Sequence, residues 1–126
     1  MLPFQDITQT VSTPEIRFDA ARSCLCIAGE SYPENSFDFY APMLRWVKEV
    51  LTALAEFHLD VNVSYLNSSS TKCMLDLLDL LEEAHKKGTA VTVTWQYDRE
   101  NPRSLDLAEE FKEEVTFPFA VVALNE

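Results

Sequence analysis

The centre of the chain changes from one hydrophobic period to another and back, and this alternation limits the fold more than any other feature. Leu59 to Leu66 alternates apolar and polar residues, as a strand with one buried face does. From about Ser69 to His85 apolar residues recur every three or four positions, which is typical of a helix. Ala90 to Tyr97 is β-branched and aromatic and indicates a strand, so the unit predicts parallel pairing in an α/β sheet. The expected core positions are Leu59, Val61, Val63 and Tyr65 on the strand, and Cys73, Met74, Leu77, Leu78 and Leu81 on the helix.

The residues before this unit predict a hairpin followed by a long helix. Glu15 to Phe18 and Cys24 to Ala28 are short extended runs joined by a polar turn. Asn35 and Ser36 are good helix starters. The buried face of this helix is expected to contain Phe37, Tyr40, Leu44, Val47, Leu51 and Leu54, widened by Met43, Trp46 and Val50. Residues 1–13 are polar and mixed, and predict a loose or edge-packed arm.

The residues after the central unit predict a third helix and a last strand. Asn101 stands at the expected cap and Pro102 at the first helical position. Residues 115–124 then form a strand, which Pro118 limits to a sheet edge or a late start. The order β-β-α-β-α-β-α-β predicts one α/β domain over residues 1–126, with a mixed, largely parallel sheet of about five strands and about three helices.

The composition disfavours several classes of function. The formal net charge is −11, and acidic residues crowd the C-terminal half. Nucleic acids and anionic membranes are recognised by clustered Lys and Arg, so neither is an expected partner. No apolar run is long enough to span a membrane, and the N-terminus lacks the pattern of a secretory signal. Three cysteines without repeated spacing, and no paired-His or calcium-loop motif, predict no disulfide framework, metal or other cofactor.

Four hydroxyl residues, Ser68 to Thr71, stand directly after Asn67, between the central strand and its helix. A single Asn or Ser suffices to cap a helix, so capping alone does not account for the cluster. Nucleophilic catalysis needs a nearby base. His58 and His85 are expected about 30 Å and about 25 Å away, at the far ends of the strand and the helix. A helix start does favour a phosphate, because it presents free N–H groups and the positive end of the helix dipole.

The strand, "LNSSS" and the helix resemble the phosphorylatable corner of STAS domains, the anti-sigma factor antagonists, whose usual pattern is Asp-Ser-Ser-Gly. Asn67 stands at the Asp position and Ser70 at the Gly position. A closer resemblance covers nearly the whole chain. The segments "GESYPENSFDFY", "YLNSSSTK", "LLDLLEEAHKKG", "VTWQYD" and "LAEEFKEE" with "FPFAV" resemble the SiaC-type regulatory phosphoproteins, a bacterial family of STAS-like single domains.

That resemblance implies a cytoplasmic switch without enzymatic activity, acting in c-di-GMP and biofilm signalling. In the family, a serine/threonine kinase of the anti-sigma-factor type phosphorylates the residue directly after the Asn, which is Ser68 here. A PP2C-type phosphatase reverses the modification, and the unmodified form binds and activates a diguanylate cyclase. Family members can carry Thr at this position. Ser69, Ser70 and Thr71 stay open as acceptors, because only the resemblance selects Ser68.

Partner contacts are expected around the same corner. If the helix starts gather on one edge of the sheet, Tyr32, Glu34 and Asn35 come near Ser68. The expected partner-binding residues are Tyr32, Glu34, Asn35, Asn67, Ser69 and Leu75. The alternative is a STAS-like domain that binds a small ligand or anion, in which the serine-rich helix start holds a phosphate or nucleotide directly. The chain has only two glycines, which disfavours a nucleotide cradle.

Overall fold

The computed structural model describes residues 4–124, and its elements follow the predicted order. The elements are β1 (Glu15–Asp19), β2 (Cys24–Ser31), α1 (Ser36–Val50), β3 (Glu56–Leu66), α2 (Ser68–Lys86), β4 (Ala90–Tyr97), α3 (Pro102–Glu113) and β5 (Phe119–Ala123). The predicted α/β fold with five strands and three helices is confirmed. The main differences are that α1 ends at Val50, short of Leu54, and that β3 already begins at Glu56.

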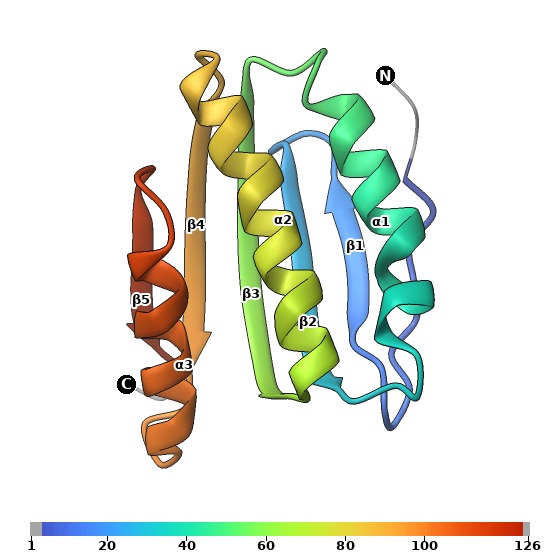
Figure 1. The fold of residues 1–126 in the computed structure, drawn as a ribbon, viewed down its shortest axis with the longest axis vertical. Coiled ribbons are helices and arrows are strands. Elements are labelled where there is room, and N and C mark those ends of the chain that lie inside the picture. Colours follow the sequence, from blue (N-terminus) through green and yellow to red (C-terminus); the bar gives the residue numbers. More distant parts are fainter. Residues whose placement is uncertain (1–3, 125–126) are drawn as a thin grey trace.

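All three helices lie on the same face of a single sheet (Figure 1). The strand order is β1-β2-β3-β4-β5, with β1 antiparallel to β2 and every other neighbouring pair parallel. Each crossover moves one strand further in the same direction, and crossovers of one hand then place every helix on one side. The carboxyl ends of the parallel strands and the starts of the helices therefore meet along one edge, the lower edge in Figure 1.

The hydrophobic core lies between the helices and the sheet. Alternation along β3 turns Phe57, Leu59, Val61 and Val63 toward the helices. The side chains that α2 buries include the five predicted ones, Cys73, Met74, Leu77, Leu78 and Leu81. In the α1 region, the core takes Tyr40, Met43, Trp46, Val47 and Val50, while Leu44, Leu51 and Leu54 are only partly buried.

Two residues predicted for the core are exposed instead. Phe37 is 50% exposed. The buried line of α1 begins at Ser36 and continues at Tyr40, so Phe37, one residue further on, lies about 100° around the helix from that line. Tyr65 is 52% exposed. The register of β2 with β3 shifts here: Gly29 pairs with Val63 but Glu30 pairs with Tyr65, so Ser64 is an extra residue in β3, and the strict alternation ends there.

The N-terminal segment packs along the outer side of β1. The backbones of Ile7 and Ile16 exchange two hydrogen bonds, with N···O distances of 2.7 and 3.0 Å. The Phe4 ring lies 4.9 Å from the Trp46 ring, measured between centroids. Residues 4–13 are therefore edge-packed rather than loose, and the first three residues lie outside the described part of the chain.

Two predicted features of the C-terminal half have different outcomes. Asn101 precedes α3 as expected, but its side chain makes no capping hydrogen bond. Pro118 directly precedes β5, which is an edge strand, as the sequence predicted.

Within residues 4–124, no helix has the length and apolar character needed to cross a bilayer. The same residues contain no cluster of three or more His, Cys, Asp or Glu side chains placed to hold a metal ion.

Candidate functional site

Two asparagines start the helices that border the hydroxyl cluster. The Asn67 Oδ1 atom accepts a hydrogen bond from the backbone N–H of Ser70 at 2.9 Å, and Asn35 caps α1 in the same way. The backbone N–H of Asn67 donates to the Ser31 carbonyl at 3.0 Å, and its Nδ2 atom donates to the Pro33 carbonyl at 3.4 Å. The loop between β2 and α1 therefore lies against the start of α2, as the sequence predicted.

Behind this corner lies a buried group of four hydroxyls. The Ser31 hydroxyl donates to the Ser70 hydroxyl at 2.7 Å and lies 2.6 Å from the Tyr40 hydroxyl. The Ser36 and Ser70 hydroxyls are 3.0 Å apart. All four side chains are at most 1% exposed, and burial raises the pKa of Tyr40 to about 12 against the opposing effect of its bond with Ser31. The Ser70 hydroxyl is therefore out of reach of another protein.

The other three hydroxyls of the cluster differ in how accessible they are to another protein. The Ser69 hydroxyl is partly buried and donates to Ser36 Oγ at 2.8 Å. The Thr71 hydroxyl donates to the Asn67 carbonyl at 3.0 Å, inside the first turn of α2. Ser68 is exposed, and its hydroxyl makes no hydrogen bond with any residue in the 4–124 range. Of the four candidate acceptors, Ser68 alone combines exposure with an uncommitted hydroxyl.

Three aromatic side chains are exposed near this corner. Tyr32, in the loop between β2 and α1, is 42% exposed. Its ring centroid lies 6.0 Å from that of Tyr65, at the end of β3, in an edge-to-face arrangement. Phe37 lies in the first turn of α1. The sequence singled out Tyr32 but assigned Tyr65 and Phe37 to the core, because it extended the apolar periods of β3 and α1 to their ends.

The remaining predicted contact residues divide into two groups. Glu34 and Asn35 are exposed in the loop beside Tyr32, and the Asn35 amide also donates to the Asp38 carboxylate at 2.9 Å. Leu75 lies further along α2 and is only partly exposed, because it packs against the core. The exposed face at the corner is therefore formed mainly by the loop, the end of β3 and the first turn of α2.

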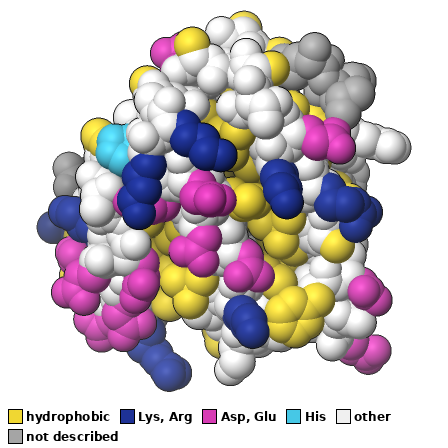
Figure 2. All heavy atoms as spheres, turned by 45° about the horizontal axis from the view of Figure 1, so that its top comes forward, with side chains coloured by type: hydrophobic (Ala, Val, Ile, Leu, Met, Phe, Trp, Pro, Cys, Tyr) yellow, Lys and Arg dark blue, Asp and Glu magenta, His cyan; other side chains and the backbone are white. Residues whose placement is uncertain are grey.

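Charge is unevenly distributed over the helical face. The first turn of α2 contains no acidic residue, and Lys72 follows Ser68 by four positions, on the same side of the helix. Further along α2, Asp76, Asp79 and Glu83 are exposed. Figure 2 shows acidic side chains gathered at the lower left, on the side where Figure 1 has α3. The start of α2 is thus the least acidic part of that helix.

No histidine lies at the corner. His58 is in the first half of β3, where its ring Nδ1 atom is hydrogen-bonded to Thr92. His85 is in the last turn of α2, with its ring 6.0 Å from that of Phe117. The expected separation of both side chains from Ser68 follows from these places at the opposite ends of β3 and α2. The corner has hydroxyl groups without a histidine base, so its geometry suits accepting a phosphoryl group better than catalysis.

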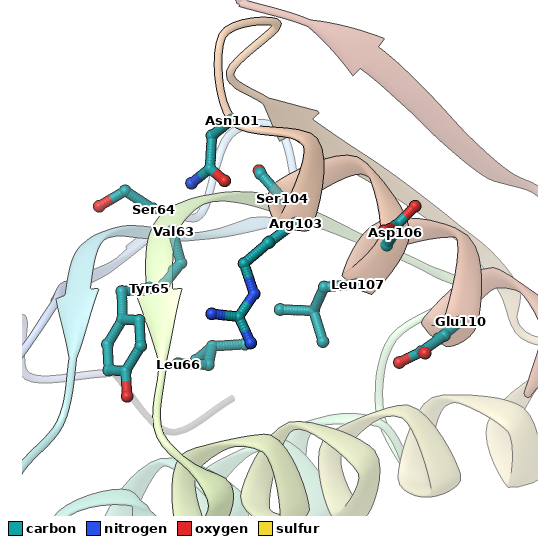
Figure 3. Close-up of a pocket in the computed structure, with 10 residues that line it drawn as sticks. All are labelled: Val63, Ser64, Tyr65, Leu66, Asn101, Arg103, Ser104, Asp106, Leu107 and Glu110. Carbon is teal, nitrogen blue, oxygen red and sulfur yellow. The ribbon is translucent and has the colours of Figure 1, made fainter.

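A cavity of about 370 Å³ borders the corner on the α3 side. Its walls include Tyr65 and Leu66 from the end of β3, and Arg103, Ser104 and Leu107 from α3. In Figure 3 the guanidinium of Arg103 points into the cavity toward Leu66. Leu66 lies two residues before Ser68, so the cavity borders the segment that leads into α2, although Ser68 does not line it.

Comparison with known proteins identifies close relatives. The sequence model of a family described as SiaC family regulatory phosphoprotein matches residues 7–124. An uncharacterized protein of Pseudomonas aeruginosa strain UCBPP-PA14 is 46% identical over 121 residues, which are 95% of this chain and 96% of that protein.

Solved structures agree with the sequence comparison. A chain in the crystal structure of the diguanylate cyclase SiaD in complex with its activator SiaC, from Pseudomonas aeruginosa, is matched with a TM-score of 0.91 and 45% identity, covering 96% of this chain and all of that one. The crystal structure of apo-SiaC from the same organism is matched with a TM-score of 0.89 and 45% identity, covering 95% of this chain and all of that one.

Proposed function

The chain belongs to the SiaC family of regulatory phosphoproteins, and on this premise we propose that it is a protein–protein switch controlled by phosphorylation of Ser68. A serine/threonine kinase of the anti-sigma-factor type adds the phosphoryl group, and a PP2C-type phosphatase removes it. The unmodified form binds and activates a diguanylate cyclase in the cytoplasm. The chain itself catalyses no reaction in this scheme.

The observation that carries the choice of acceptor is the contrast within the hydroxyl cluster. Ser70 is fully buried, and the hydroxyls of Ser69 and Thr71 are engaged in hydrogen bonds. A kinase that modified any of these three would first have to break contacts that hold the start of α2. Modification of Ser68 breaks none of the described contacts. Accessibility therefore supports Ser68, which the resemblance selected by its position after Asn67.

The cyclase as partner is supported by the solved complex of SiaD with its activator SiaC, whose matched chain shares the whole fold described above. The exposed aromatic residues Tyr32, Phe37 and Tyr65 supply a docking surface beside Ser68. Aromatic side chains are enriched among the residues that dominate binding energies at protein interfaces. We therefore place the cyclase contact on this surface, together with Glu34 and Asn35, next to Asn67, Ser69 and Leu75.

The proposed off-state needs no change of fold. A phosphate adds about −1.5 to −2 charges at neutral pH, and burying it against a partner requires its desolvation. A penalty of about 3 kcal/mol weakens binding more than 100-fold. The present fold matches both apo-SiaC and the chain from the cyclase complex, with TM-scores of 0.89 and 0.91, which supports a block by charge and shape rather than refolding. Different backbones for the Ser68→Asp variant and the unmodified protein would contradict this mechanism.

A second candidate function is a STAS-like domain that binds a small ligand or anion. The cavity beside the corner, with Arg103 pointing into it, favours this alternative. Stabilisation against thermal unfolding by millimolar phosphate or by a nucleotide would support it. No such stabilisation is expected if the cavity serves only the switch.

The deciding experiment is phosphosite mass spectrometry on the protein purified from its native cells, with Ser68→Ala and Ser69→Ala strains in parallel. Phosphate on Ser68 that disappears only in the Ser68→Ala strain supports the proposal. Unmodified protein under several growth conditions would reduce Ser68 to an ordinary helix residue. A binding titration of unmodified and phosphorylated protein with the cognate cyclase then measures the switch, with loss of affinity upon phosphorylation expected.

A further inference from the structure

One arginine beside the acceptor corner lacks a partner. Arg103 is an exposed residue in the first turn of α3, and its guanidinium points into the cavity toward Leu66 (Figure 3). Among the residues that the structure describes, it forms no ion pair and no side-chain hydrogen bond. A guanidinium in this position offers a planar, two-pronged donor that suits phosphate oxygens.

The geometry of α2 turns Ser68 toward the same side. Ser69 faces α1, since its hydroxyl donates to Ser36. Glu82 faces the connection between α3 and β5, where its carboxylate accepts bonds of 2.9 and 2.6 Å from Thr116. At about 100° per residue, Ser68 lies about 100° from Ser69 and about 40° from Glu82 around the helix. Ser68 is about 180° from the buried Leu77, so its exposed hydroxyl lies on the outer side of α2, nearer to the α3 side than to the α1 side.

The other charged groups around the cavity leave Arg103 available. Asp106 and Glu110 line the same cavity from α3, and neither forms an ion pair with Arg103. Both carboxylates lie further along α3 than Arg103, away from the edge where the helices start. On α2, Lys72 is the nearest cation in sequence to Ser68, one turn along. A phosphate on Ser68 thus has positive groups on both helices at this edge.

We propose that Arg103 is the intramolecular receptor for the phosphoryl group on Ser68, an inference that rests on the proposed phosphorylation of that residue. The phosphate bridges the first turns of α2 and α3 across the mouth of the cavity. Leu66 and the neighbouring face of Tyr65 are covered by this bridge. The phosphorylated form therefore loses part of its docking surface, in addition to carrying a charge that opposes docking.

The test is a phosphorus NMR titration of protein with phosphoserine incorporated at position 68 during translation, so that no kinase is needed. The second pKa of a phosphoserine is about 6. An exposed ion pair with Arg103 lowers it by about half a unit. We expect this pKa to rise by that amount in Arg103→Gln and to recover partly in Arg103→Lys, which keeps the charge but not the two-pronged geometry.

Arg45→Gln is the matched control, since Arg45 is an exposed arginine on α1, on the other side of α2, and the pKa is expected to stay unchanged. An unchanged phosphate pKa in Arg103→Gln would overturn the inference. The proposed function fails separately, when phosphoserine at position 68 leaves cyclase binding intact whatever the titration shows. If phosphoserine at position 68 abolishes cyclase binding but the phosphate pKa is the same in Arg103→Gln, the switch stands and Arg103 has no part in it.

Discussion

The Ser70 hydroxyl accepts a hydrogen bond from the Ser31 hydroxyl at 2.7 Å, and neither side chain is exposed to solvent. This bond joins the end of β2 to the first turn of α2, across 39 residues of chain. It fixes the start of α2 against the sheet without using the neighbouring Ser68 hydroxyl. The corner thus has an inner serine that holds the structure and an outer serine that is free to be modified.

Replacing Ser70 and Ser68 by alanine, one at a time, separates the structural role from the role as acceptor. Ser70→Ala is expected to lower the free energy of unfolding by about 1–3 kcal/mol, because it removes the buried hydroxyl that accepts the Ser31 hydrogen bond and lies 3.0 Å from the Ser36 hydroxyl. Ser68→Ala is expected to change it by less than about 0.5 kcal/mol, as for other exposed positions. Urea unfolding of both variants checks this. Equal losses of stability would mean that Ser68 also supports the corner.

A negative charge at Ser68 is expected to stabilise the fold. The first turn of α2 has no acidic residue, and an anion at a helix start contributes about 0.3–1 kcal/mol. Ser68→Asp should therefore unfold at higher temperature than wild type, and the gain should shrink in high salt. Ser68→Asn is the uncharged control. Lower stability of Ser68→Asp at low salt would contradict the assignment of Ser68 to this position.

Tyr65 is expected to contribute to cyclase binding. The Tyr65→Ala variant should weaken the affinity for the cognate diguanylate cyclase by at least about tenfold, because an exposed aromatic side chain at the centre of an interface contributes strongly. Val122→Ala on the edge strand β5, where Val122 is 40% exposed, is the control and should bind as wild type. Calorimetric titration of unmodified protein measures both. Equal affinities for all three proteins would place the docking surface elsewhere.

Tyr40 makes the free energy of unfolding depend on pH in the alkaline range. Burial raises the pKa of Tyr40 to about 12 from its ordinary value of about 10. Above pH 10 the unfolded chain loses this proton while the folded protein keeps it, so the unfolding free energy falls as the pH rises from about 10 to about 12. Tyr40→Phe should lack this contribution to the decline. Chemical unfolding over this pH range checks the difference, and parallel curves for the two proteins would contradict it.

The order of elements and the parallel sheet were predictable, because they depend on hydrophobic period and on helix-start residues that act locally. Leu59 to Leu66 and the helix after Ser69 show two different periods, and Asn35 and Asn67 cap the helices that they precede. The prediction of burial failed at the end of β3 and at the start of α1, where the apolar period continues but the side chains are exposed. Phe37 keeps the apolar pattern but lies to one side of the buried line of α1, and Tyr65 keeps it beyond the register shift near the end of β3, so both side chains are exposed.

The sequence by itself determined the fold class, the place of the hydroxyl cluster at a strand-to-helix junction and, through resemblance, the family. It did not determine which of Ser68, Ser69, Ser70 and Thr71 is accessible, since all four have nearly the same chemistry. Only the tertiary structure decided this, by placing Ser31 and Ser36 against the start of α2, where they bond to Ser70 and Ser69 and leave Ser68 exposed. Burial depends on contacts between residues far apart in the chain, and local sequence does not encode those contacts.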